Sequence, residues 1–97
     1  MRVRLSDLAE QDLLDIATFI AADSVLQAEI YTDKLLQACA GLAESAERYA
    51  LIPRYEGRGY RRRPFENYAI ICVVTSDEVV VVRITSSARD IDTLLDD

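Results

Sequence analysis

Two β-branched apolar runs in the C-terminal half constrain the fold of this chain more than any other feature. Residues 69–74 read AIICVV and residues 79–84 read VVVVRI, and only the short segment 75–78 separates them. Runs of this length and composition predict β-strands, and so short a connection predicts an antiparallel hairpin. Since both runs are almost continuously apolar, we expect central strands with helices covering at least one face of the sheet.

The N-terminal half predicts a short strand followed by two helices. Residues 2–5 alternate polar and apolar side chains, and Ser6 is a candidate N-cap for a first amphipathic helix of about four turns. Ser24 begins a capping-box pattern for a second helix, which we expect to reach Arg48 or Tyr49. Because the linker between the two helices is short, they should form an antiparallel helical hairpin.

The region after Pro53 changes from helical to extended patterning. Two glycines predict a loop, and residues 61–65 predict a strand that should lie at a sheet edge, because Pro64 lacks an amide donor. Residues 88–95 predict a short final helix. We therefore expect one domain over residues 1–97, with an α+β fold of order β-α-α-β-β-β. Its N-terminal helical hairpin should pack on a mainly antiparallel sheet.

Charge is unevenly distributed along the chain. The net charge is −6 and histidine is absent, yet residues 54–63 carry five arginines against a single glutamate. An acidic chain is poorly suited to general nucleic-acid binding, because a polyanion is repelled at long range. Without histidine, the sequence offers no usual acid–base residue near neutral pH and no catalytic residue is assigned.

The two cysteines predict a reduced, metal-free protein. Cys39 and Cys72 stand alone with no ligand-like spacing, so we expect two buried free thiols, no metal and no cofactor. A disulfide between them is the alternative, which a reducing cytosol disfavours. A cytoplasmic location is expected, because the N-terminus lacks a signal-like segment and no apolar run approaches the roughly 20 residues of a membrane span.

The arginine run suggests an anion-recognising surface. In a strand, Arg61 and Arg63 share one face and Arg62 takes the other. The alternative is that these arginines are solvated. The candidates for target or anion binding are Arg61, Arg63, Tyr68, Arg83 and Arg89.

Three segments resemble the ParE/RelE toxin superfamily of bacterial type II toxin–antitoxin systems. Residues 8–16 look like its opening A-x-x-D-L-x-x-I pattern, and residues 61–71 are similar to R-x-x-P-x-x-x-Y-x-I-x-Y. Residues 82–90 look like I-x-R-V-x-H-x-x-R-D. The order and spacing match over nearly the whole chain, so the resemblance implies the same β-α-α-β-β-β fold.

Departures from these patterns indicate the ParE-like branch. Ser86 stands where many relatives carry histidine, Cys72 replaces the usual tyrosine, and the clustered lysines of a RelE-like nuclease are absent. The resemblance thus implies a non-enzymatic inhibitor of DNA gyrase that acts by protein–protein contact and serves plasmid stabilisation. The alternatives are a RelE-like ribosome-dependent mRNA endoribonuclease, and a non-toxic relative acting only in antitoxin binding and operon autoregulation.

The resemblance also implies partners. We expect a cognate antitoxin with a ribbon-helix-helix DNA-binding domain, in a hetero-oligomer that meets DNA only through the antitoxin or gyrase. No membrane partner is expected. Arg61→Ala or Arg89→Ala should weaken toxicity more than Arg54→Ala or Arg58→Ala, since the latter pair lies in the expected loop.

Overall fold

The two apolar runs form the central strands of a four-stranded sheet. In the computed structural model, which describes residues 1–95, β3 (Tyr68–Val74) and β4 (Glu78–Ser86) pair antiparallel across a tight turn. The Thr75 hydroxyl closes this turn by accepting hydrogen bonds from the amides of Asp77 and Glu78. The predicted hairpin is therefore confirmed.

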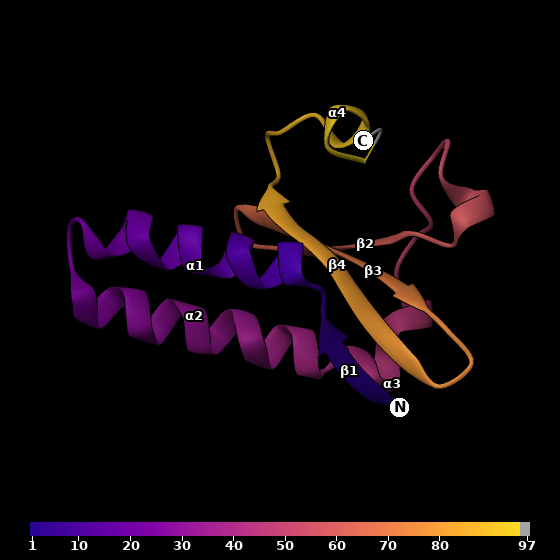
Figure 1. Ribbon diagram of the computed structural model, residues 1–97, viewed down its shortest axis with the longest axis horizontal. Coiled ribbons are helices and arrows are strands. Elements are labelled where there is room, and N and C mark those ends of the chain that lie inside the picture. The colour runs from indigo at the N-terminus through magenta and orange to yellow at the C-terminus, as the bar shows by residue number, and fades with distance from the viewer. Residues whose placement is uncertain (96–97) are drawn as a thin grey trace.

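The remaining strands flank this hairpin in the order β1-β4-β3-β2 (Figure 1). β2 (Arg61–Phe65) pairs antiparallel with β3 and lies at one edge, where Pro64 was expected. β1 (Arg2–Leu5) pairs parallel with the first half of β4 at the other edge. The sheet is thus mainly antiparallel, and the α+β order β-α-α-β-β-β is confirmed.

Two long helices form the predicted antiparallel hairpin. α1 (Asp7–Ala21) and α2 (Val25–Ala40) begin at Ser6 and Ser24, whose hydroxyls accept hydrogen bonds from the amides of Ala9 and Gln27. These caps satisfy amide groups that have no partner within the helix. Figure 1 shows the hairpin lying across one face of the sheet and projecting beyond it at the tip.

The second helix is shorter than its sequence pattern predicts. It ends at Ala40 and does not continue to Arg48 or Tyr49, because the chain breaks at Gly41 into α3 (Leu42–Ser45) and a 3₁₀ turn, η1 (Ala46–Arg48). Glycine is a poor helix former, and a break there keeps the apolar side chains of the following turns in the core. The predicted end of this helix was therefore wrong, because the apolar residues keep a helical spacing beyond the point where the helix ends.

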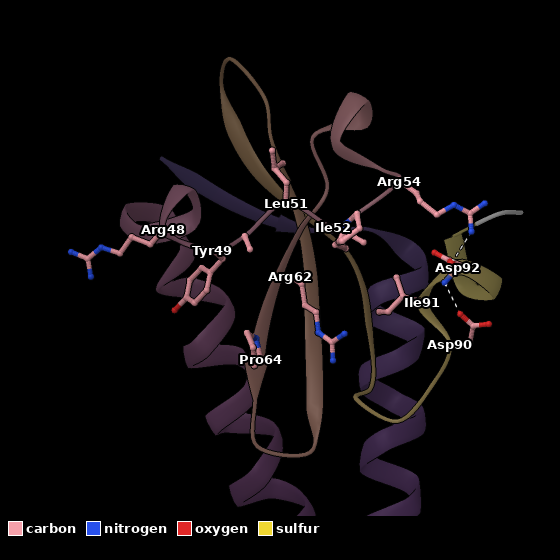
Figure 2. A pocket seen from close by; sticks show the side chains of 12 residues that line it. Arg48, Tyr49, Leu51, Ile52, Arg54, Arg62, Pro64, Asp90, Ile91 and Asp92 are labelled. Carbon is pink, nitrogen blue, oxygen red and sulfur yellow. Dashed lines mark hydrogen bonds and ion pairs between the residues drawn. The ribbon is translucent and has the colours of Figure 1, made fainter.

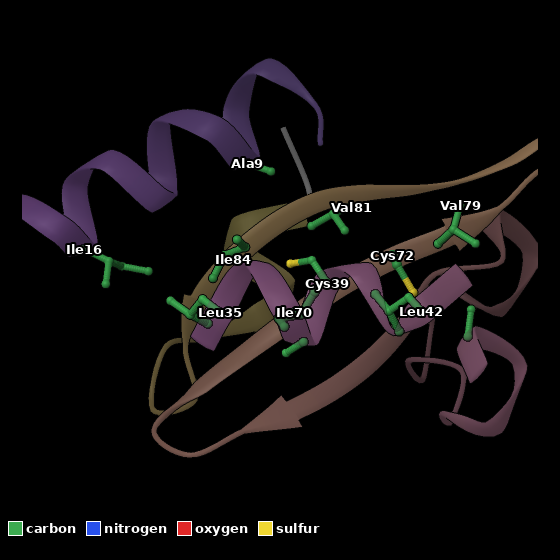
Figure 3. Packing of buried hydrophobic residues seen from close by; sticks show 12 residues of the cluster. Ala9, Ile16, Leu35, Cys39, Leu42, Ile70, Cys72, Val79, Val81 and Ile84 are labelled. Atoms are coloured by element: carbon green, nitrogen blue, oxygen red, sulfur yellow. The ribbon is translucent and has the colours of Figure 1, made fainter. Parts of the chain in front are cut away.

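The larger core lies between the sheet and the helical hairpin (Figure 3). It contains Leu35 and Cys39 from α2, Ile70 and Cys72 from β3, and Val81 from β4, all at most 1% exposed. Both cysteines are buried free thiols, as predicted. Their burial raises the pKa of each thiol to about 11, although Arg63 opposes this at Cys39 and Arg61 opposes it at Cys72.

A smaller core covers the opposite face of the sheet. There Ile71 of β3 packs with Ile52 and Tyr55 from the loop and with Leu94 and Leu95 of α4 (Ile91–Leu95). A second 3₁₀ turn, η2 (Glu56–Arg58), lies in the same loop.

The final helix begins later than the predicted residue 88. The Asp90 carboxylate accepts hydrogen bonds from the Asp92 amide and the Thr93 hydroxyl, so it fixes the first turn of α4 at Ile91.

Candidate functional site

The arginines of β2 divide between the two faces of the sheet. Arg61 points toward the helical side, where its guanidinium donates to the backbone oxygens of Tyr49 at 2.7 Å and Glu47 at 3.4 Å. These bonds tie the edge strand to the chain segment that follows η1. Arg61 was predicted as a binding residue; in the structure its guanidinium contacts its own chain, and its part in target binding stays a prediction.

Arg63 is also held by its own chain. Its guanidinium carbon lies 5.4 Å from the ring centre of Tyr49 and 5.5 Å from that of Phe65, and one nitrogen donates to the Pro64 oxygen. A cation over two aromatic faces is stabilised by both ring quadrupoles. The side chain remains partly exposed, so it lies at the rim of the helical side.

Arg83 forms a two-pronged ion pair with Asp12 of α1. Its Nε and Nη2 donate to the two carboxylate oxygens at 2.8 and 2.9 Å, and the side chains of Arg83 and Asp12 are 18% and 12% exposed. A bulge in β4 makes this possible, because Ile71 pairs with Arg83 while Cys72 already pairs with Val81. The ion pair therefore fastens the first helix to the second half of β4.

Asp12 also completes the edge of β4 where β1 has ended. Its carboxylate accepts a hydrogen bond from the Ile84 amide at 2.9 Å, while the Ser6 amide and hydroxyl donate to the oxygens of Val81 and Val82. A carboxylate with three donors is strongly oriented. Asp12 and Arg83, one from each end of the chain, thus meet in a structural contact.

Tyr68 belongs to an aromatic cluster at the turn between β2 and β3. The Tyr31 ring centre lies 5.9 Å from that of Tyr68 and 6.2 Å from that of Phe65. Burial and the neighbouring Glu66 carboxylate raise the pKa of Tyr31 to about 12. Tyr68 is partly buried here and packs against the core.

Arg89 is the most available of the predicted residues. It lies exposed in the loop before α4, where its amide donates to the Ser86 oxygen. Its guanidinium makes no hydrogen bond or ion pair with residues 1–95. The five predicted residues therefore do not converge on one centre, since Arg61, Arg63 and Arg83 are engaged in separate contacts.

A cavity of about 530 Å³ opens on the α4 side of the sheet (Figure 2). Its apolar walls come from Leu51 and Ile52 in the loop, Ile91 of α4 and Pro64 of β2. Figure 2 shows Arg62 pointing into the space between Pro64 and Ile91. The cavity thus combines apolar walls with three arginines, Arg48, Arg54 and Arg62, and two aspartates, Asp90 and Asp92.

No cluster of three or more potential metal ligands exists among the described residues. In the same part of the chain, no helix has the length and apolarity needed to span a membrane.

Comparison with known proteins assigns the chain to a family. A family model described as "ParE toxin of type II toxin-antitoxin system, parDE" matches residues 3–91. The chain belongs to the ParE toxin family. The comparison with curated proteins gives no match.

Two solved structures share the ParE-family fold of this chain. A chain of the chromosomal ParDE toxin–antitoxin system from P. aeruginosa superimposes with a TM-score of 0.75 at 20% identity, covering 89% of this chain and 95% of that one. A chain of the toxin–antitoxin complex RelBE2 from Mycobacterium tuberculosis gives a TM-score of 0.65 at 19% identity, covering 91% and 92%. At these sequence identities, the similarity of the two structures to this chain shows a shared fold only.

Sequence reasoning on this ParE-family chain missed two features. The first is the position of Arg62 at the cavity on the α4 side. The alternation of side chains along a strand places Arg62 on the face opposite Arg61 and Arg63, and this was the sequence signal that its role differs from theirs. The second feature is the apolar outer surface of the helical hairpin. Its exposed side chains include Leu14, Phe19, Val25, Leu26 and Leu36. Those residues fall outside the apolar stripes that predict the core.

Proposed function

We propose that this chain is a toxin that inhibits DNA gyrase by protein–protein contact and is neutralised by a cognate antitoxin. Membership of the ParE toxin family over residues 3–91 carries the proposal. The family assignment makes it a toxin of the type II class, and the choice of gyrase as target is our inference. A cytoplasmic location follows from the same inference.

The contacts of the arginines favour protein binding over RNA cleavage. Cleavage of RNA needs cationic groups free to stabilise phosphate charge and a group that transfers protons. Arg61 and Arg83 instead donate to groups of their own chain, and Ser86 occupies the motif position of a histidine. Arg89, exposed in the loop before α4, is the candidate we propose for target contact, with Arg63 and Tyr68 contributing from β2 and from the start of β3, at the end of the sheet where β4 also ends.

The outer surface of the helical hairpin is the surface we propose for the antitoxin. A groove between α1 and α2 is lined by Leu13, Leu14 and Leu36, and Phe19 at the tip is 77% exposed. Exposed apolar surface of this kind typically marks a protein interface. Residues 1–50 carry nine acidic against four basic side chains, so a basic amphipathic helix of the antitoxin complements the surface.

The antitoxin also explains how an acidic toxin would act in operon autoregulation. We propose that the antitoxin supplies a ribbon-helix-helix domain and that the toxin meets DNA only through it or through gyrase. The two structural neighbours come from complexes or systems named for a toxin and an antitoxin, which supports a hetero-oligomer.

Purified gyrase tests the target. Adding the toxin should stop DNA supercoiling and accumulate cleaved complexes, and adding the antitoxin should reverse both effects. Arg89→Ala should weaken inhibition several-fold, whereas Arg58→Ala, which changes another exposed arginine, serves as the matched control. Unchanged supercoiling at toxin levels that block growth would refute the gyrase proposal.

Two further assays separate the alternatives. Specific cuts within codons, detected by primer extension on translated mRNA, would identify a ribosome-dependent endoribonuclease. Normal growth on expression without antitoxin would identify a relative that serves only in antitoxin binding and autoregulation.

A further inference from the structure

We propose that the cavity beneath α4 binds an acidic side chain of a protein partner, flanked by apolar residues, and that Arg62 pairs with its carboxylate. The proposal goes beyond gyrase inhibition, because it assigns a binding site and a ligand chemistry that do not depend on the identity of the target. It rests on the contacts of Arg62, on the cavity walls and on the charges around them.

Arg62 has the donors for such a ligand, and its guanidinium has no hydrogen-bond or ion-pair partner among residues 1–95. Its neighbours in β2, Arg61 and Arg63, use their guanidiniums in contacts on the helical side. Arg62 pairs across the strands with Ile71, whose side chain lies in the smaller core, so Arg62 points to the α4 side. Its partly buried guanidinium makes no hydrogen bond or ion pair within the part of the chain that the structure describes. A carboxylate matches the planar fork of such a group.

The walls of the cavity select for apolar neighbours of the carboxylate. Figure 2 shows Pro64 on one side of the Arg62 side chain and Ile91 on the other, and Leu51 and Ile52 line the same cavity. At about 530 Å³, the cavity has the volume of an ordinary ligand pocket. Apolar walls exclude water and strengthen a charged hydrogen bond formed between them.

The two carboxylates that line the cavity within residues 1–95, Asp90 and Asp92, already have partners. Asp92 forms an ion pair with Arg54 at 2.8 Å, and the two oxygens of Asp90 accept the Asp92 amide and the Thr93 hydroxyl. Neither forms an ion pair with Arg62, although both line the cavity. Within residues 1–95, Arg48 and Arg62 line the cavity without an ion pair, and Figure 2 shows Arg62 as the one that points into it.

A peptide fits this site better than a nucleic acid. Nucleic-acid binding depends on several phosphate contacts along a cationic surface. Here two aspartates line the cavity together with three arginines, of which Arg54 is paired with Asp92 and Arg62 points into the cavity (Figure 2), and the chain carries a net charge of −6. A single acidic residue between apolar neighbours satisfies the guanidinium and covers the walls.

Nuclear magnetic resonance titration of the full-length protein tests the proposal. The probe is the blocked tripeptide acetyl-leucyl-glutamyl-isoleucine amide, whose only charge is the glutamate carboxylate. We expect saturable shifts of the Arg62 Nε–H signal and of the Ile91 amide. The matched glutamine tripeptide should bind about tenfold more weakly or worse, since it lacks the charge-assisted hydrogen bonds.

Two substitutions separate placement from bulk charge. Arg62→Gln should weaken binding of the glutamate peptide by about tenfold, whereas Arg48→Gln, an exposed arginine at the same cavity, should change it by less than about twofold. Equal affinity for the two tripeptides, or equal loss from the two substitutions, would overturn the proposal. Tighter binding of a single-stranded octanucleotide at the same signals would also overturn it, because the site would then be a nucleic-acid site. The amide spectrum and thermal unfolding of each variant verify that it is folded.

Discussion

The two faces of the sheet differ in what covers them and in how they use their arginines. The helical face is covered by α1, α2 and α3, and its core includes Leu35, Ile70 and Val81. The opposite face is covered by a loop and by α4, a helix of five residues. One face therefore has a continuous core, whereas the other has a smaller core beside an open cavity.

The difference shows where binding is compatible with stability. On the helical side, Arg61 donates to backbone oxygens and Arg63 stacks on two rings, so both help to hold the fold. On the α4 side, Arg62 and the nearby Arg89 have no such partners within residues 1–95. Arginines that already hold the fold are costly to divert, so the α4 side is better placed to meet a partner.

Matched leucine substitutions should give the largest difference in stability between the two faces of the sheet. Leu35→Ala, at 0% exposure under the hairpin, should lower the free energy of unfolding by about 3–4 kcal/mol. Leu94→Ala in α4, at 5% exposure, should cost about 1–2 kcal/mol, because α4 can detach while the rest stays folded. Urea unfolding of both variants measures the difference. Equal losses would mean that the two cores contribute alike.

The thiols of the helical face should make the protein sensitive to alkali. Burial raises the pKa of Cys39 and Cys72 from about 9 to about 11. As the pH rises, a thiol ionises in the unfolded chain before it ionises in the folded protein. The stability that the neutral buried thiols contribute is therefore complete below pH 9 and is lost as the pH rises through 11. Between about pH 8 and about pH 10.5, the free energy of unfolding should fall by about 2 kcal/mol per thiol. Urea unfolding of a Cys39→Ala, Cys72→Ala double variant should show a flatter dependence; an unchanged slope would contradict this origin.

Two of the ion pairs, Arg83–Asp12 and Arg54–Asp92, provide a third contrast. Asp12→Asn should destabilise the fold by about 2 kcal/mol, because Arg83 then faces an amide in a half-buried place. Asp92→Asn breaks the pair with Arg54, whose side chain is 67% exposed, and should cost less than about 1 kcal/mol. Differential scanning calorimetry distinguishes the two. A larger loss for Asp92→Asn would place the main clamp of the fold on the α4 side.

Adjacent arginines of β2 should give the smallest contrast. Arg61→Ala loses hydrogen bonds to the Tyr49 and Glu47 oxygens and should cost about 1 kcal/mol. Arg62→Ala loses no such bond and should change stability by less than about 0.5 kcal/mol. Thermal unfolding of both variants provides the measurement. Equal destabilisation would show that Arg62 has a structural role as well.

Local patterns were sufficient to predict the elements of the fold. The β-branched runs, the serine caps at Ser6 and Ser24, and the position of Pro64 depend on neighbouring residues, and all were confirmed. The end of α2 was wrong, because an apolar spacing of three and four persists through Gly41 even though the helix does not. The apolar spacing continues past Gly41 because Leu42 and Ala46 pack in the core, and core packing cannot be predicted from neighbouring residues alone.

The candidate site was harder to predict, because its side chains are committed by contacts distant in sequence. Arg83 and Asp12 are 71 residues apart, and only the bulge in β4 and the start of α1 bring them together. The partners of Arg61 are likewise set by the break after α2. Arg62 was separable from its neighbours by strand alternation alone, but the cavity that gives it a role depends on where the loop and α4 pack.

The backbone groups at the outer edge of β2 are hydrogen-bonded within the chain, and this affects how the protein associates with itself. Along the outer side of β2, the Arg62 amide is bonded to the Ala50 oxygen and Pro64 has no amide to offer. The Pro64 oxygen, in turn, accepts the Arg63 guanidinium. A second copy of β2 therefore finds few free donors and acceptors with which to extend the sheet. The concentrated protein should accordingly resist edge-to-edge polymerisation at β2, and a partner recognising this side would have to do so through side chains.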